Sequence, residues 1–172
     1  MSDDIVILSG ARTAIGTFGG ALAGMAPIDT ATVAAKAALE RAGVAGDQIG
    51  HVVFGHVINT EPRDMYLSRV AAVQAGIPNG TPAMNVNRLC GSGIQALISG
   101  AQLLLLGEAT CCLVGGTESM SQAPHAIYGA RRGLRLGQGK LEDMLLASLF
   151  DSYCGLYTVP YTHMTLPTLY PG

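Results

Sequence analysis

The stretch from residue 86 to residue 96 constrains the fold of this chain most, because a strand, a glycine turn and an apolar helix follow one another there. The pattern over residues 82–88 predicts a strand. Residues 93–106 are apolar on nearly every side, which is typical of a helix buried among other elements. We therefore expect Cys90 to lie just before the N-terminus of a central helix.

This expected position of Cys90 favours a reactive thiolate. The free N–H groups of a helix's first turn carry a partial positive charge that stabilises an anion. Gly91 and Gly93 allow a sharp turn and leave the sulfur unshielded. Backbone N–H groups of such a turn also donate to a developing oxyanion. The pattern indicates a nucleophile for acyl transfer, and the alternative is a small buried cysteine that only packs against the helix.

Residues 91–96 also fit the G-x-G-x-x-A pattern of dinucleotide-binding domains, with Glu118 as the acid that would bind a ribose. The preceding strand argues against this alternative. A central parallel strand is almost wholly apolar, whereas this one carries Asn85, Asn87 and Arg88. We therefore disfavour a dinucleotide-binding domain.

Residues 87–93 closely resemble the active-cysteine motif of the thiolases, the acetyl-CoA acyltransferases. Residues 11–20 resemble the N-terminal signature of that family, and residues 115–121 resemble the segment that follows its fourth strand. The resemblance covers about residues 4–156. It implies that Cys90 is acylated by a coenzyme A thioester, with the Cys90 N–H contributing to the oxyanion hole.

The same resemblance implies what this chain lacks. In thiolases a His activates the nucleophile and a second Cys acts as acid and base, and both lie in the C-terminal half. Nothing here resembles those motifs, and His51 and His56, which flank a strand, are expected to be structural. We therefore expect the chain alone to be a very poor catalyst.

The order of predicted elements is β-α-β-α-β-α-β, which indicates an α/β layered architecture. The resemblance implies a thiolase-like layered fold, represented by its N-terminal half and the start of the loop domain. The expected strands are 5–9, 52–58, 82–88 and 109–114. The expected helices are 31–42 with Thr30 as its cap, 65–75, 93–106 and 141–150.

Three parts of the chain are expected. Residues 1–118 form the N-terminal thiolase-fold half, and residues 119–156 begin the loop domain. Residues 157–172 form a divergent tail, which a truncated or frame-shifted reading or an engineered end would explain, because residues 152–172 hold no charged side chain. A basic cluster in the second part faces solvent or contacts coenzyme A phosphates or another subunit. Its members are Arg131, Arg132, Arg135 and Lys140.

The composition limits the classes of partner that we expect this chain to bind. A net charge of −2 argues against nucleic acid, and no apolar run approaches the roughly 20 residues that span a bilayer. The first residues lack a basic leader, so we expect a cytoplasmic location.

Cys111, Cys112 and Cys154 have no zinc-site spacing and are expected to pack rather than react. No metal or cofactor is expected beyond the coenzyme A thioesters used as substrates.

The resemblance implies a homodimer or homotetramer, because thiolases pair across a dimer through the strand before the nucleophile. It places the protein in fatty acid metabolism, either condensing acetyl-CoA to acetoacetyl-CoA or cleaving 3-ketoacyl-CoA. A non-catalytic module for acyl-CoA binding or dimerisation is the alternative. The apolar helix at 93–106 predicts that the chain alone exposes an apolar surface and associates.

Overall fold

The computed structural model describes residues 4–134, 136–137 and 139–157. The chain divides into two compact units, Met1–Gln122 and Ala123–Gly172, which are described separately below. The expected parts 1–118 and 119–156 remain a prediction about domains.

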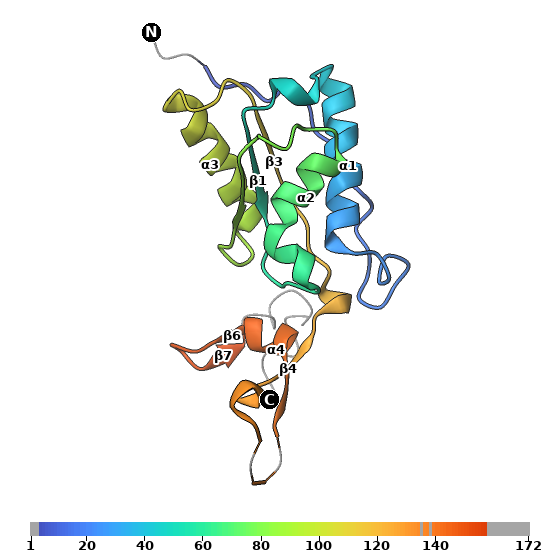
Figure 1. Ribbon diagram of the computed structural model, residues 1–172, viewed down its shortest axis with the longest axis vertical. Helices are drawn as coiled ribbons and strands as arrows, with labels where there is room; N and C mark the ends of the chain where they lie inside the picture. The colour runs from blue at the N-terminus through green and yellow to red at the C-terminus, as the bar shows by residue number, and fades with distance from the viewer. Residues whose placement is uncertain (1–3, 135, 138, 158–172) are drawn as a thin grey trace, which may run out of the picture. The chain divides into compact units, whose positions relative to one another are not determined.

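The first unit is built on a three-stranded parallel sheet (Figure 1). Its strands are β1 (His51–Gly55), β2 (Ala83–Val86) and β3 (Cys112–Gly116), in the order β2-β1-β3. In the register, Val52 lies opposite Ala83 on one side and Leu113 on the other. The central strand is β1, and its apolar run is buried on both faces, as is typical of parallel sheets.

Helices cover both faces of this sheet (Figure 1). On one face lies α3 (Ser92–Leu105), and on the other lie α1 (Pro27–Ala42) and α2 (Leu67–Gln74). Short 3-10 helices η1 (Gly46–Gln48), η2 (Pro62–Tyr66) and η3 (Met120–Gln122) complete the unit. The main apolar core lies between the sheet and the α1/α2 layer, and it includes Ile28, Ala35, Leu39, Val52, Phe54, Leu67, Ala71 and Leu113. The expected α/β fold class is confirmed.

The expected start of the first helix was wrong by four residues. The helix begins at Pro27, whose fixed φ suits the first helical position. Thr30 lies inside α1, and its hydroxyl donates to the Pro27 carbonyl over 2.9 Å instead of capping the helix. The end is as expected, because Gly43 takes the left-handed conformation with φ 64°.

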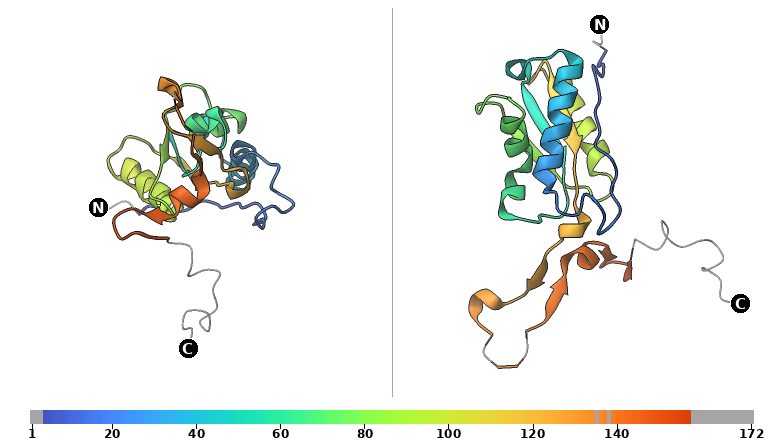
Figure 2. Two further views of the ribbon diagram at one scale, coloured as in Figure 1. Left: turned by 90° about the horizontal axis from the view of Figure 1, so that it is seen from below. Right: turned by 90° about the vertical axis from the view of Figure 1, so that its right-hand side faces the viewer.

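The expected first strand, residues 5–9, is absent from the sheet. These residues run extended beside α1 (Figure 2), where the Ser9 hydroxyl donates to the Ala38 carbonyl over 2.6 Å. The Arg41 side chain of α1 holds the next residue, Gly10, by donating to its carbonyl over 2.9 Å. An apolar run becomes a strand only where another strand hydrogen-bonds to it, and the described residues supply none here. Ile7 is therefore 79% exposed.

The apolar helix at 93–106 was expected to be buried among other elements, and the chain alone was expected to expose an apolar surface; α3 is covered on one face only and exposes the rest. Only Ser92, Ala96 and Gly100 are buried, because the sheet covers a single face of the helix. The large exposed side chains that follow are called the α3 apolar face. They are Ile94, Leu97, Ile98, Leu105 and Leu106.

The second unit contains two small antiparallel pairs, β4 (His125–Ile127) with β5 (Leu141–Asp143) and β6 (Phe150–Asp151) with β7 (Leu156–Tyr157). The 3-10 helix η4 (Ala130–Arg132) follows β4. The expected helix 141–150 shrinks to α4 (Met144–Ser148), because the Asp143 side chain caps it by accepting from the Leu145 N–H over 2.8 Å. Of the expected tail 157–172, Tyr157 belongs to β7, and residues 158–172 lie outside the described residues.

Candidate active site

Cys90 is an exposed free thiol two residues before Ser92, the first residue of α3. Gly91 is the N-cap residue of that helix. The expected placement of the cysteine, after a strand and just before a helix N-terminus, is therefore observed. The strand before it, β2, lies at the edge of the sheet rather than at its centre. Polar residues are therefore less unusual in β2 than they would be in a central parallel strand.

The sharp turn at the cysteine depends on Leu89 rather than on a glycine. Leu89 has φ 49° and is the one described residue other than glycine with positive φ. Gly91 has φ −87°, which any residue can adopt. A left-handed leucine costs about 1–2 kcal/mol, so the fold holds strain next to the thiol.

Local hydrogen bonds hold this conformation. The Ser92 hydroxyl accepts from the Arg88 N–H over 2.9 Å and donates to the Leu89 carbonyl over 2.6 Å. The Asn87 side chain accepts from the Leu89 N–H over 3.0 Å. Sequence reasoning did not assign these roles to Asn87 and Ser92, although both residue types commonly bond to nearby backbone in turns.

One backbone donor of the turn is available. The N–H groups of Gly91 and Ser92 donate to the carbonyls of Arg88 and Leu89. Within the part of the chain that the structure describes, the N–H of Cys90 donates to no acceptor. An exposed thiol beside a free backbone donor is the arrangement that nucleophilic attack on a thioester requires.

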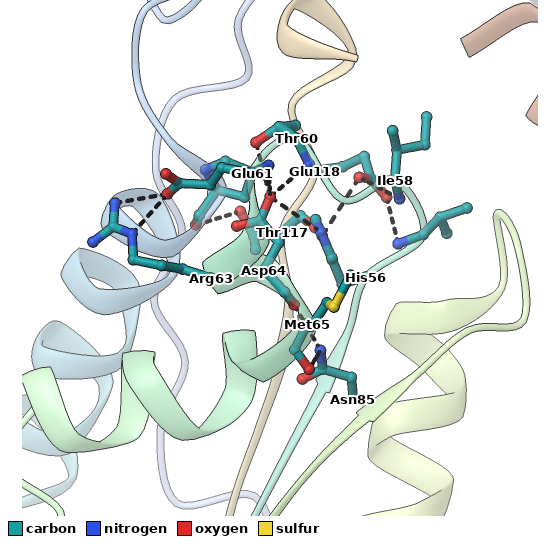
Figure 3. Close-up of polar contacts among 12 residues, drawn as sticks. His56, Ile58, Thr60, Glu61, Arg63, Asp64, Met65, Asn85, Thr117 and Glu118 are labelled. Carbon is teal, nitrogen blue, oxygen red and sulfur yellow. Dashed lines mark hydrogen bonds and ion pairs between the residues drawn. The ribbon is translucent and has the colours of Figure 1, made fainter. Parts of the chain in front are cut away.

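A partly buried polar cluster lies where β1 and β3 end (Figure 3). We call it the His56 cluster, and it consists of His56, Asp64, Thr117 and Glu118. The side chains of His56 and Asp64 are 1% and 0% exposed. His56 Nδ1 lies 3.0 Å from the Thr117 carbonyl oxygen and 3.4 Å from Glu118 Oε1. His56 Nε2 lies 3.8 Å from Asp64 Oδ2.

The two carboxylates of this cluster accept from loop backbone. Glu118 accepts the N–H groups of Val57 and Ile58 over 2.9 and 3.1 Å. Asp64 accepts the N–H of Thr60 over 2.7 Å and its hydroxyl over 2.8 Å. Glu118 therefore bonds to the loop after β1, a structural role different from the ribose binding that a dinucleotide-binding domain would require. The expected structural role of His56 agrees with its burial.

Two thiols have perturbed acidity. Burial raises the pKa of the Cys112 thiol, with the neighbouring Cys111 as a smaller cause. In the second unit, the hydrogen bond with Asp151 raises the pKa of the Cys154 thiol. Both shifts keep the thiols protonated, which agrees with the expectation that they do not react.

A cavity of about 390 Å³ lies in the first unit between two stretches that the sequence singled out. Its lining includes residues 11–18 on one side and residues 116–121 on the other. The Thr30 and Thr117 hydroxyls, 2.7 Å apart, connect α1 to the second stretch. The two stretches thus lie together in space, although about a hundred residues separate them.

The basic cluster lies in the second unit, where Arg131, Arg132 and Lys140 are exposed. Lys140 Nζ lies 3.5 Å from Glu142 Oε1, and Arg135 lies outside the described residues.

Among the residues described, no three His, Cys, Asp or Glu side chains form a group that could hold a metal ion. In the same part of the chain, no helix has the length and apolar character needed to cross a bilayer.

These features define an α/β protein with an exposed cysteine at the start of a helix. The family model of the thiolase N-terminal domain matches residues 5–162, and the chain belongs to the thiolase family. The match extends slightly past residue 156, where the resemblance was expected to stop. It favours the acyltransferase prediction over a dinucleotide-binding domain.

Among known relatives, the chain is 54% identical to beta-ketothiolase BktB of Cupriavidus necator over 89% of its own length and 39% of the relative's. It is 40% identical to human mitochondrial 3-ketoacyl-CoA thiolase, over 88% of this chain and 38% of that protein. The chain thus spans about two-fifths of the length of these relatives.

Solved structures agree with the fold. The structure of human mitochondrial 3-ketoacyl-CoA thiolase in complex with CoA matches with a TM-score of 0.85 and 41% identity, over 88% of this chain and 39% of that one. The Bacillus anthracis acetyl-CoA acetyltransferase matches with a TM-score of 0.82 and 34% identity, over 89% of this chain and 39% of that one. The thiolase-like fold class is therefore confirmed.

Proposed function

We propose that this chain supplies the acyl-accepting cysteine of a thiolase-type acyltransferase. The Cys90 thiolate attacks the carbonyl carbon of an acyl-CoA thioester, and the N–H of Cys90 donates to the oxyanion. The carbon–sulfur bond to coenzyme A then breaks, coenzyme A leaves as a thiolate that takes up a proton, and a Cys90 thioester remains. The observation that carries this proposal is the exposed Cys90 beside an unused N–H at the start of α3.

In the whole protein the thioester would react onward. In synthesis, the carbanion of a second acetyl-CoA attacks the Cys90 thioester and gives acetoacetyl-CoA. In degradation, Cys90 attacks the 3-keto carbon of a 3-ketoacyl-CoA, the carbon–carbon bond breaks, and the acetyl-CoA carbanion that leaves takes up a proton. Coenzyme A then takes the acyl group from Cys90 and restores the thiol. Relatives named acetyl-CoA acetyltransferase and 3-ketoacyl-CoA thiolase support both directions. A solved relative in complex with CoA supports coenzyme A thioesters as the substrates.

The chain alone should be a very poor catalyst. The base that activates the cysteine lies, by resemblance, in the part of the relatives that this chain does not span. A cysteine without its base reacts only through its own thiolate fraction. Turnover near that of a complete thiolase would contradict this expectation.

The direct test is to incubate the chain with acetyl-CoA, quench it in acid, digest it and weigh the peptide that contains Cys90. We expect an acetyl group on Cys90 and none on Cys111, Cys112 or Cys154. The Cys90→Ala variant is the control and should stay unlabelled. A folded chain without the adduct would mean either that the missing base is indispensable or that the chain is a non-catalytic module, and repeating the test with the C-terminal part of a thiolase supplied would decide between the two.

Assembly and location belong to the same proposal. Because no other described strand pairs with the outer edge of β2, that edge can pair with a second copy, which supports a homodimer or a dimer of dimers. A cytoplasmic location stays a prediction, since relatives include both cytosolic and mitochondrial enzymes.

A further inference from the structure

We propose that His56 is a positioning residue for Cys90, acting through the ends of the sheet strands. The inference rests on the proposed function, in which Cys90 is the nucleophile. A buried imidazole is costly unless its polar atoms are used, and the His56 side chain is 1% exposed. Its contacts reach the segments that lead to the nucleophile turn.

The first link joins β1 to the residues after β3. A carbonyl oxygen only accepts hydrogen bonds, so the His56 Nδ1 that lies 3.0 Å from the Thr117 oxygen carries a proton and donates it there. The Thr117 N–H in turn donates to the Gly55 carbonyl over 3.1 Å. Side chain and backbone therefore hold these two strand ends together.

The second link joins β1 to β2, the strand that leads into the turn. The backbone N–H of His56 donates to the carbonyl of Val86, the last residue of β2, over 3.1 Å. Asn85 of the same strand donates to the Asp64 carbonyl over 3.0 Å. The end of β2 is thus fixed against β1 and η2, four residues before Cys90.

The third link reaches the start of α3. Gly55, the residue before His56, has no side chain, and a Cβ placed on it would lie 2.6 Å from the Ser92 carbonyl carbon. A shift of the end of β1 therefore displaces the first turn of α3, which directly follows the nucleophile turn, and the N–H groups of a helix's first turn stabilise a nearby anion. The His56 side chain, through its bond to Thr117, helps to fix where that end of β1 lies.

Of the two imidazole nitrogens of His56, only Nδ1 makes a hydrogen bond within the described part of the chain. The 3.8 Å between His56 Nε2 and Asp64 Oδ2 is too long for a direct hydrogen bond. The Nδ1 bond to Thr117 is therefore the one that positions the strand ends. Asparagine places its amide nitrogen where histidine has Nδ1, and glutamine places one near Nε2, so the pair His56→Asn and His56→Gln separates the two contacts.

The experiment uses the full chain as wild type, His56→Asn and His56→Gln, with folding checked by thermal melts. Alkylation by iodoacetamide is followed for each cysteine peptide by mass, and acetylation of Cys90 is measured in a single turnover against acetyl-CoA concentration. Cys154, an exposed thiol in the other unit, is the internal control.

We expect His56→Gln to slow alkylation of Cys90 by about two- to fivefold, the share of stabilisation that a helix N-terminus supplies. Cys154 should react unchanged, and His56→Asn should stay within twofold of wild type. In acetylation, His56→Gln should lower the maximal rate and leave the half-saturating acetyl-CoA concentration unchanged. Equal Cys90 rates in all three proteins, or equal losses in both variants, would overturn the proposal.

Two further outcomes keep the test decisive. If His56→Gln does not fold, a more than twofold loss in a folded His56→Asn overturns the positioning role, and a rate within twofold of wild type supports it. If acetyl-CoA labels no protein even when the C-terminal part of a thiolase is supplied, while alkylation still depends on position 56, the proposed function fails and the positioning role stands. Equal acetylation of all three proteins supports the proposed function and overturns the positioning role.

Discussion

Gly55 at the end of β1 lies directly against Ser92 at the start of α3. A Cβ placed on Gly55 would lie 2.6 Å from the carbonyl carbon of Ser92 and 2.8 Å from the nitrogen of Gly93. Both neighbours are backbone atoms, so neither can rotate away. The close approach brings the central strand to the first turn of the helix that follows Cys90, and it is possible only because residue 55 has no side chain.

Replacing Gly55 with alanine should therefore lower the free energy of unfolding by about 1–3 kcal/mol, the usual range for an overpacked interior site. Urea titrations would measure it. The matched control is Gly93→Ala, because a Cβ on that residue meets nothing within 4 Å and alanine favours a helix. Equal stability of Gly55→Ala and wild type would show that the two elements can separate without loss.

Leu89 offers a test of strain beside the nucleophile. Because glycine adopts φ 49° freely, Leu89→Gly should raise the free energy of unfolding by about 1 kcal/mol while slowing acetylation of Cys90. Leu97→Gly, inside α3, is the control and should lower stability by about 1 kcal/mol or more. Urea titration reports the first effect and peptide mass the second. Loss of stability in Leu89→Gly would contradict strain at this residue.

The α3 apolar face should make the chain associate. Ile94 is 62% exposed and Leu105 is 70% exposed, and both belong to a face rich in large apolar side chains. We expect sedimentation to show species larger than a monomer and an apolar dye to bind. The double variant Ile94→Gln/Leu105→Gln should weaken both signals, whereas Leu136→Gln in the other unit should not. A monomeric wild type that binds no dye would refute the prediction.

The Asp151 and Cys154 pair predicts a pH effect in the second unit. The hydrogen bond between them raises the pKa of the Cys154 thiol, so Asp151→Asn should speed alkylation of Cys154 near pH 8. Cys112 is the control, because burial rather than Asp151 raises its pKa. An unchanged Cys154 rate in Asp151→Asn would mean that the carboxylate does not protect the thiol.

The same pair has a consequence at acid pH. Its hydrogen bonds, chiefly the one with Cys154, hold the pKa of the Asp151 carboxyl below the ordinary value of 3.8. The contribution to stability is therefore present above that value and is lost as pH falls through the lowered pKa. Local exchange of the Tyr153 amide, which donates to Asp151 over 2.9 Å, should rise only below about pH 4.

Much of the fold followed from the sequence, because helices and turns depend on residues that are close along the chain. Gly43 located the end of α1, and the glycine turn located Cys90 before α3. The thiolase motifs identified the family, which the comparisons confirmed. Errors at helix starts have equally local causes, such as the side chain of Asp143 capping α4.

Other features depended on which segments lie side by side. Residues 5–9 have the composition of a strand, yet no described strand pairs with them. The apolar α3 has only one covered face, since the sheet packs against one side. The sequence suggested glycine for the turn at Cys90, but the left-handed residue is Leu89, which hydrogen bonds from Asn87 and Ser92 hold in place.

The His56 cluster shows most clearly which features the sequence determined and which only the tertiary structure decided. The sequence alone determined the family, the α/β class and the one cysteine that stands before a helix. Only the tertiary structure brought His56 to Thr117 and Glu118, about sixty residues further along the chain. Hydrogen bonding and burial depend on distances in space, and those distances are set when parallel strands align, not by the order of residues along the chain.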